Sequence, residues 1–190
     1  MLFRSVCYAK FIKFAPHPIK RVEIPFGNGK SLPAYLHLPR KPVNGEKFPI
    51  VFSCGGMDGS KENMVSLYGD RFMERGIAVL AIDGPGQAEA VSRGIYFSPE
   101  NWEKCANAVY DFLSQQPNID IKNLVIRGSS FGSFWGTVAA ATLGSRVKAF
   151  VTTIASHLMK MICSTGIFSL MSNRMDGLTI SCAVMKCAIR

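Results

Sequence analysis

The chain has 190 residues, of which 48% are hydrophobic and 18% are charged. This length allows one substantial hydrophobic core, and the composition excludes wholesale disorder. The net charge is +9, but no run of five like charges occurs and no aromatic residues are interleaved with a basic stripe. We therefore predict a solvated basic surface and no nucleic-acid partner.

The cysteines and the start of the chain bear on location. None of the six cysteines forms a Cys-x-x-Cys pair or stands with histidines at zinc-ligand spacing. We expect free thiols, no metal and no cofactor. No stretch reaches the roughly 18 apolar residues of a membrane span. Basic residues interrupt the apolar start, which excludes a secretory signal and leaves a transit peptide open. The expected location is cytoplasmic.

Two strand-like segments, Arg21 to Phe26 and Leu32 to Leu38, flank a hairpin signal at Gly27-Asn28-Gly29. Short apolar runs then alternate with helical patterns. In chain order they are a strand at Phe48 to Ser53, a helix between Ser60 and Gly76, a strand at Ile77 to Ile82, a helix capped by Ser98, a strand at Asn123 to Arg127, a helix at Phe131 to Leu143 and a strand at Val147 to Ala155.

This alternation predicts an α/β fold: a mostly parallel sheet with helices on both faces and an antiparallel hairpin at its N-terminal edge. We divide the chain into an N-terminal extension, 1–20, a partial core, 21–155, and an atypical tail, 156–190. No strand–helix alternation is visible in the tail. We expect the fold to be incomplete at the C-terminus.

Gly128-Ser129-Ser130-Phe131-Gly132 is a Gly-x-Ser-x-Gly motif between a predicted strand and a predicted helix, the setting of a nucleophile elbow. We predict Ser130 as the catalytic nucleophile and the Phe131 amide as an oxyanion donor. The second donor is expected from the loop that begins at Cys54, at Gly56 or Met57. The alternatives are a plain strand–helix turn and a tight glycine turn.

Asp83 ends a predicted strand, where it serves either as a turn cap or as a catalytic acid. His17 and His37 are predicted as surface or hydrogen-bonded structural residues.

Three segments, CGGMDGSKE from Cys54, IDGPGQ from Ile82 and GSSFG from Gly128, resemble one branch of the α/β-hydrolases. That branch contains dihydroxypseudooxynicotine hydrolase and the fermentation–respiration-switch esterase. The resemblance covers about Arg21 to Ala155 and implies hydrolysis of an ester or of a carbon–carbon bond beside a ketone in a small molecule. Relatives carry a helical segment before the core, for which this chain has little room, and a glycine where Ala88 stands.

The fold's triad runs Ser, acid, His along the chain. After Ser130 the only acid is Asp176 and the only histidine is His157, in the reverse order. The hypotheses are a serine hydrolase seen as an incomplete chain, an inactive fragment or binding module, and a nucleotide-binding domain. The last lacks both the Gly-x-Gly-x-x-Gly and the P-loop lysine motifs. Self-association stays open.

Overall fold

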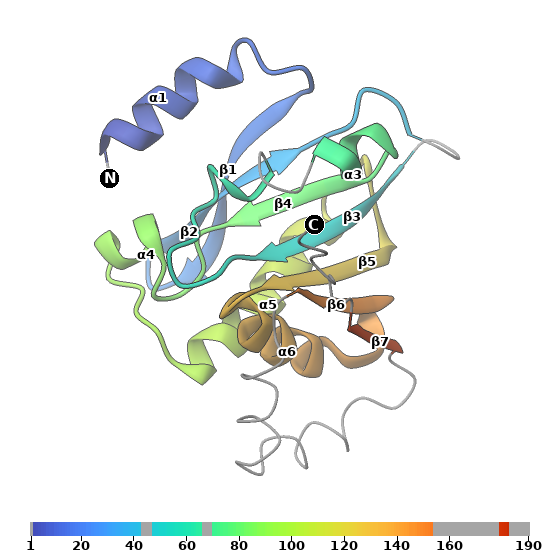
Figure 1. Cartoon of the computed structure of the whole chain (residues 1–190). Helices are drawn as coiled ribbons and strands as arrows, with labels where there is room; N and C mark the ends of the chain where they lie inside the picture. The colour runs from blue at the N-terminus through green and yellow to red at the C-terminus, as the bar shows by residue number, and fades with distance from the viewer. Residues whose placement is uncertain (1, 43–46, 66–69, 154–178, 183–190) are drawn as a thin grey trace, which may run out of the picture.

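The computed structural model describes residues 2–42, 47–65, 70–153 and 179–182. Seven strands form one sheet in the order β1-β2-β4-β3-β5-β6-β7 (Figure 1). In chain order the strands are β1 (Ile19–Gly27), β2 (Lys30–His37), β3 (Phe48–Cys54), β4 (Ala78–Ile82), β5 (Ile119–Ser129), β6 (Ala149–Thr153) and β7 (Thr179–Cys182).

The predicted hairpin forms the edge of the sheet. β1 and β2 pair antiparallel, and Gly27 aligns with Lys30 across a two-residue turn. Asn28 and Gly29 have φ angles of +52° and +68°, so both central residues are left-handed, as a type I′ turn requires. β2 pairs antiparallel with β4, and the pairs from β4 through β3, β5 and β6 to β7 are all parallel.

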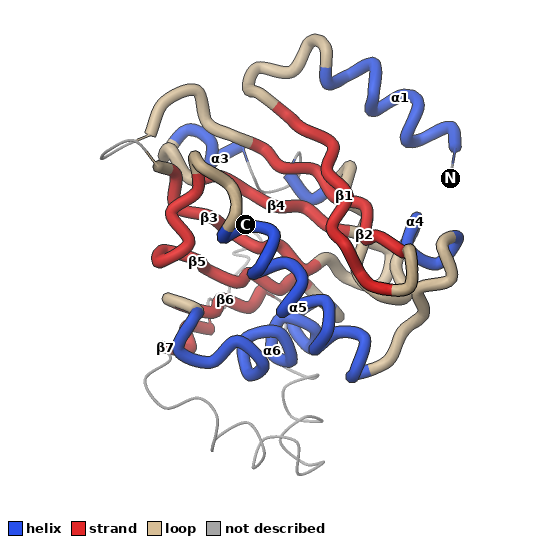
Figure 2. Tube along the Cα trace, turned by 180° about the vertical axis from the view of Figure 1, so that it is seen from behind, coloured by secondary structure: helices blue, strands red, loops and turns tan. Residues whose placement is uncertain are grey.

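Helices cover both faces of the sheet, as predicted. Figure 2 shows α5 (Pro99–Ser114) and α6 (Gly132–Leu143) side by side over one face. The other face carries α3 (Asp70–Glu74). Shorter elements are α4 (Ala88–Ser92) and the 3₁₀ turn η1 (Gly144–Arg146). The predicted cap of α5 is confirmed, since Ser98 Oγ accepts a 3.1 Å hydrogen bond from the Asn101 amide.

The core follows from the alternation of side chains along each strand. Ile50 and Phe52 of β3 face α5 and α6, within a large buried apolar cluster. Val51, between them, faces the opposite side and joins a smaller cluster with Met64 and Val65. The central strands are therefore buried on both faces, which explains why their sequences are continuous apolar runs.

Two elements go beyond the sequence prediction. An 11-residue helix, α1 (Leu2–Ile12), precedes the hairpin, although we expected little room for one. β7 lies within the segment where no strand was visible, and it pairs with β6. The division into three parts stays a prediction. Among the described residues, no helix is long and apolar enough to cross a membrane.

Candidate active site

Ser130 stands at the turn between β5 and α6. Its φ angle is +54°, in the left-handed region that residues with a Cβ rarely adopt. β5 ends at Ser129 and α6 begins at Gly132. Ser130 therefore occupies a sharp and strained strand-to-helix turn, the backbone conformation expected at this position of the motif.

The two glycines of the motif allow that turn to close. A Cβ placed on Gly128 would lie 2.5 Å from the Gly132 carbonyl oxygen. A Cβ on Gly132 would lie 2.2 Å from the carbonyl oxygen of Cys54 and 2.4 Å from that of Gly55. These are backbone atoms, so any larger side chain at either glycine would force the turn apart.

Gly56 lies directly against Ser130. β3 and β5 are parallel neighbours, with Cys54 aligned to Gly128. The loop after β3 and the turn after β5 therefore meet at the carboxyl ends of these two strands. A Cβ built on Gly56 would lie 3.1 Å from Ser130 Cβ and 3.5 Å from Ser130 Oγ. The structure thus brings together Ser130 and the loop from which the sequence predicted a second oxyanion donor.

A pocket of about 290 Å³ opens beside Ser130. The side chain of Met57 is 71% exposed at its rim. The lining residues belong to the loop after β3, the helical turn that follows it, and the end of β5: Gly55, Gly56, Met57, Asp58, Gly59, Asn63, Met64, Arg127, Ser129 and Ser130.

Phe131 follows Ser130 at the turn that leads into α6. Its ring packs at 5.2 Å, edge to face, against Trp135 of α6, away from the pocket lining. Its amide lies one residue before the first residue of α6, where backbone N–H groups have no partner within the helix and the helix dipole is positive. Such a position suits a developing negative charge.

Asp83 follows β4 and is fully buried. Its Oδ1 accepts a 2.7 Å hydrogen bond from the Lys61 amide, and its Oδ2 lies 2.8 Å from Lys61 Nζ. The Glu89 amide also donates to Oδ2, at 3.2 Å. Since Asp83 does not line the pocket, the geometry supports the turn-holding interpretation over the catalytic one.

The family described as "Esterase FrsA-like" matches residues 3–181. The chain belongs to this FrsA-like esterase family.

Among curated relatives, "Hydrolase LUC6" from Fusarium sp is 34% identical over 140 residues, which is 70% of this chain and 33% of that protein. The "20-hydroxy-prefusarin hydrolase FUS2" of Gibberella moniliformis is 31% identical over 142 residues, again 70% and 33%. The chain therefore spans about a third of the length of the curated relatives it matches.

Solved structures of known hydrolases share the fold. The structure of 2,6-dihydroxy-pseudo-oxynicotine hydrolase superposes with a TM-score of 0.68 at 27% identity, covering 77% of this chain and 40% of that one. A dienelactone hydrolase-like promiscuous phosphotriesterase, P91 from metagenomic libraries, has a TM-score of 0.63 at 17% identity and covers 90% and 83%. The second likeness shows the fold alone.

Within the described residues, the histidines of this chain do not meet Ser130. His17 Nε2 lies 3.0 Å from His37 Nδ1, and β2 places His37 beside Val79, near the start of β4, whereas Ser130 follows the opposite end of the parallel strands. Burial, followed by the neighbouring His17, lowers the pKa of His37 to about 3. His157 and Asp176 lie outside the described residues.

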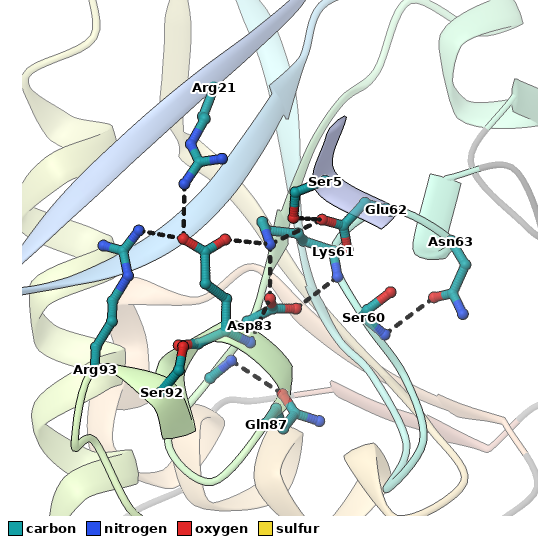
Figure 3. A network of polar contacts seen from close by, with 12 residues as sticks. Ser5, Arg21, Ser60, Lys61, Glu62, Asn63, Asp83, Gln87, Ser92 and Arg93 are labelled. Carbon is teal, nitrogen blue, oxygen red and sulfur yellow. Dashed lines mark hydrogen bonds and ion pairs between the residues drawn. The ribbon is translucent and has the colours of Figure 1, made fainter. Parts of the chain in front are cut away.

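Sequence reasoning missed the role of Lys61, which is only 1% exposed. Figure 3 shows its side chain between the acids that surround it. Its ammonium contacts three carboxylates: Asp83 at 2.8 Å, Glu89 at 2.8 Å and Glu62 at 2.9 Å. Burial alone would lower the pKa of Lys61, but these partners outweigh it and raise the pKa above its ordinary value. Glu62 is the sequence neighbour of Lys61, but Asp83 and Glu89 both follow β4, so no local spacing predicts the whole cluster.

Proposed function

We propose that the protein is a serine hydrolase that cleaves an ester, or a carbon–carbon bond beside a ketone, in a small molecule. The observation that carries the proposal is the left-handed backbone of Ser130 with the Gly56 backbone packed against its side chain. Membership of the FrsA-like esterase family supports it. Two similar proteins are named as hydrolases of small molecules, one of 20-hydroxy-prefusarin and one of 2,6-dihydroxy-pseudo-oxynicotine, which supports a small-molecule substrate.

In this mechanism Ser130 Oγ attacks the substrate carbonyl carbon while its proton passes to a base. The negative charge on the carbonyl oxygen is stabilised by the Phe131 amide and by the Gly56 or Met57 amide. The leaving group departs with a proton, and water then releases the acyl group from Ser130. The mechanism requires a base for Ser130, and no histidine lines the pocket among residues 2–42, 47–65, 70–153 and 179–182.

The test uses the full chain. We expect a fluorophosphonate probe to label Ser130, with the site located by peptide mass spectrometry, and we expect turnover of a p-nitrophenyl ester or a β-diketone. Ser130→Ala should abolish labelling and hydrolysis. Ser114→Ala is the matched control, because the Ser114 hydroxyl donates a hydrogen bond to the Asp111 carbonyl oxygen at the C-terminal end of α5. Hydrolysis retained in Ser130→Ala would refute the proposal.

A further inference from the structure

The side chain of Gln87 bridges two loops beside the pocket. It is 4% exposed, and its Nε2 donates 2.9 Å hydrogen bonds to the carbonyl oxygens of both Gly55 and Gly56. Its Oε1 accepts a 3.0 Å bond from the Gly84 amide, which Figure 3 draws as a dashed line. Both polar atoms of one buried amide are thus engaged, and its donor acts only on the loop that faces Ser130.

Those two carbonyls determine where two amides point. A peptide unit is planar and trans, so its C=O and N–H bonds point in opposite directions. The Gly55 carbonyl shares a peptide unit with the Gly56 amide, and the Gly56 carbonyl shares one with the Met57 amide. Gln87 therefore fixes the orientation of both peptide units that carry the candidate oxyanion donors.

Glycine makes such a restraint necessary. Gly55 and Gly56 lack a Cβ, so their peptide units have wide rotational freedom without an external partner. Only one further hydrogen bond among the described backbone groups reaches these carbonyls, from the Gly59 amide to Gly56, at 3.0 Å.

Gln87 is itself held firmly. The backbone amide of Gln87 donates a 2.9 Å hydrogen bond to the Gly84 carbonyl oxygen. Gly84 lies against the Trp102 ring, where an added Cβ would come within 2.3 Å, and the Trp102 indole donates to the Pro85 carbonyl at 3.1 Å. The Asp83–Gln87 loop therefore provides a rigid base from which one side chain can orient the neighbouring loop.

We propose that Gln87 is a positioning residue that aims the Gly56 and Met57 amides at the oxyanion. This inference rests on the proposed function. It also assigns a role to Gln87, the last residue of the IDGPGQ segment, which has no part in the proposed catalytic mechanism. A merely structural role would affect stability alone, whereas a positioning role affects the reaction of Ser130 at constant fold.

The experiment compares Gln87→Glu and Gln87→Met with the wild type in the full-length protein. The glutamate has the same shape but, as a carboxylate, cannot donate, while methionine removes the polar atoms without adding charge. Val109→Ala, in the buried face of α5, is a control for lost stability. The rate at which the fluorophosphonate labels Ser130 is measured at a temperature where every variant is folded. This probe suits the test because its phosphonyl oxygen requires the same hydrogen-bond donors as the oxyanion.

We expect both Gln87 variants to be labelled about ten- to a hundredfold more slowly, with kcat on an ester lowered and KM little changed. The backbone amide NMR signals of Gly56 and Met57 should shift in both variants. Val109→Ala should keep the wild-type rate and signals.

Suppose the wild type is labelled, and a folded Gln87 variant is labelled at the same rate with the same Gly56 and Met57 amide signals. That result would overturn the inference and leave the proposed function intact. Absence of labelling in the wild type would instead overturn the proposed function, and the inference with it.

Discussion

The loop after β3 and the turn after β5 line the same pocket, yet different forces hold them. The first is tied by polar side chains: Gln87 bonds two of its carbonyls, and Lys61 joins it to Asp83. The second is held by close backbone packing, with Gly128 and Gly132 in positions that leave no space for a Cβ. One wall of the pocket therefore depends on charge and hydrogen bonds, and the other on shape.

This difference determines how each wall can fail. A polar tie loses its energy when one partner is removed or neutralised, so its strength varies with pH. Steric packing has no such dependence, since nothing in it titrates. Variants on the two sides should therefore separate in both magnitude and pH response.

The largest effect is expected for Lys61→Met, which leaves Asp83, Glu62 and Glu89 without their shared cation. Removing one partner of a buried ion pair costs about 3–5 kcal/mol. Urea unfolding at pH 7 measures it. Lys104→Met is the control, because Lys104 is exposed and contacts only the Phe26 ring, at 4.6 Å, among the interactions described. Equal losses in the two variants would contradict the assigned role.

Gly132→Ala tests the packed side. The new methyl would overlap two carbonyl oxygens of the neighbouring loop, and we expect a loss of about 3 kcal/mol in the free energy of unfolding. Gly29→Ala is the control, since its Cβ would meet no atom within 4 Å and only its φ of +68° carries a penalty, about 1 kcal/mol. A Gly132→Ala protein as stable as Gly29→Ala would show that the turn can relax.

Acid should weaken the polar side selectively. Burial would raise the pKa of Glu89, but hydrogen bonds from Lys61 and Arg93 outweigh it and lower the pKa to about 2, from the ordinary 4.5. Between these values the unfolded chain takes up a proton that the folded chain does not, so stability falls as the pH falls.

We expect the wild type to lose about 1 kcal/mol more than Glu89→Gln between pH 5 and pH 2.5. Urea unfolding at the two pH values measures this loss. The cost of Gly132→Ala should be the same at both. A pH-dependent cost for the glycine variant would remove the distinction between the two walls.

The smallest effect concerns the strain at Ser130. Glycine tolerates its φ of +54°, so Ser130→Gly should be about 1 kcal/mol more stable than Ser130→Ala. At Ser129, which lies in β5 outside the left-handed region, the order should reverse because glycine is unfavourable within a strand. Thermal unfolding of the four variants decides it, and the same order at both positions would argue against strain.

The sequence predicted most of the sheet because its signals are local. The runs at Phe48 and Ile77 are apolar on both faces, Asn28-Gly29 marks the hairpin, and Ser98 caps its helix. β7 carried no such signal, because four residues are too few to show the alternation or the apolar run that marks a strand.

At the site, the spacing of the Gly-x-Ser-x-Gly motif predicted the turn at Ser130. The partners of Lys61 and Gln87 were not predictable, since they depend on which loops become neighbours in the folded sheet. Ala88 illustrates the same limit: its φ of +32° is unusual for a residue with a Cβ, and only the structure gives that angle.

The two stacked tryptophans make the intrinsic fluorescence of this molecule sensitive to one place in the fold. The chain has two tryptophans, and Trp102 and Trp135 lie face to face with ring centroids 5.0 Å apart and planes 1° apart. The Trp102 ring packs against Gly84 of the Asp83–Gln87 loop, and the Trp135 ring contacts Phe131 beside the turn at Ser130. Intrinsic fluorescence therefore arises at the junction of the two walls, and an emission change during unfolding would mark the moment when α5 and α6 separate beneath the pocket.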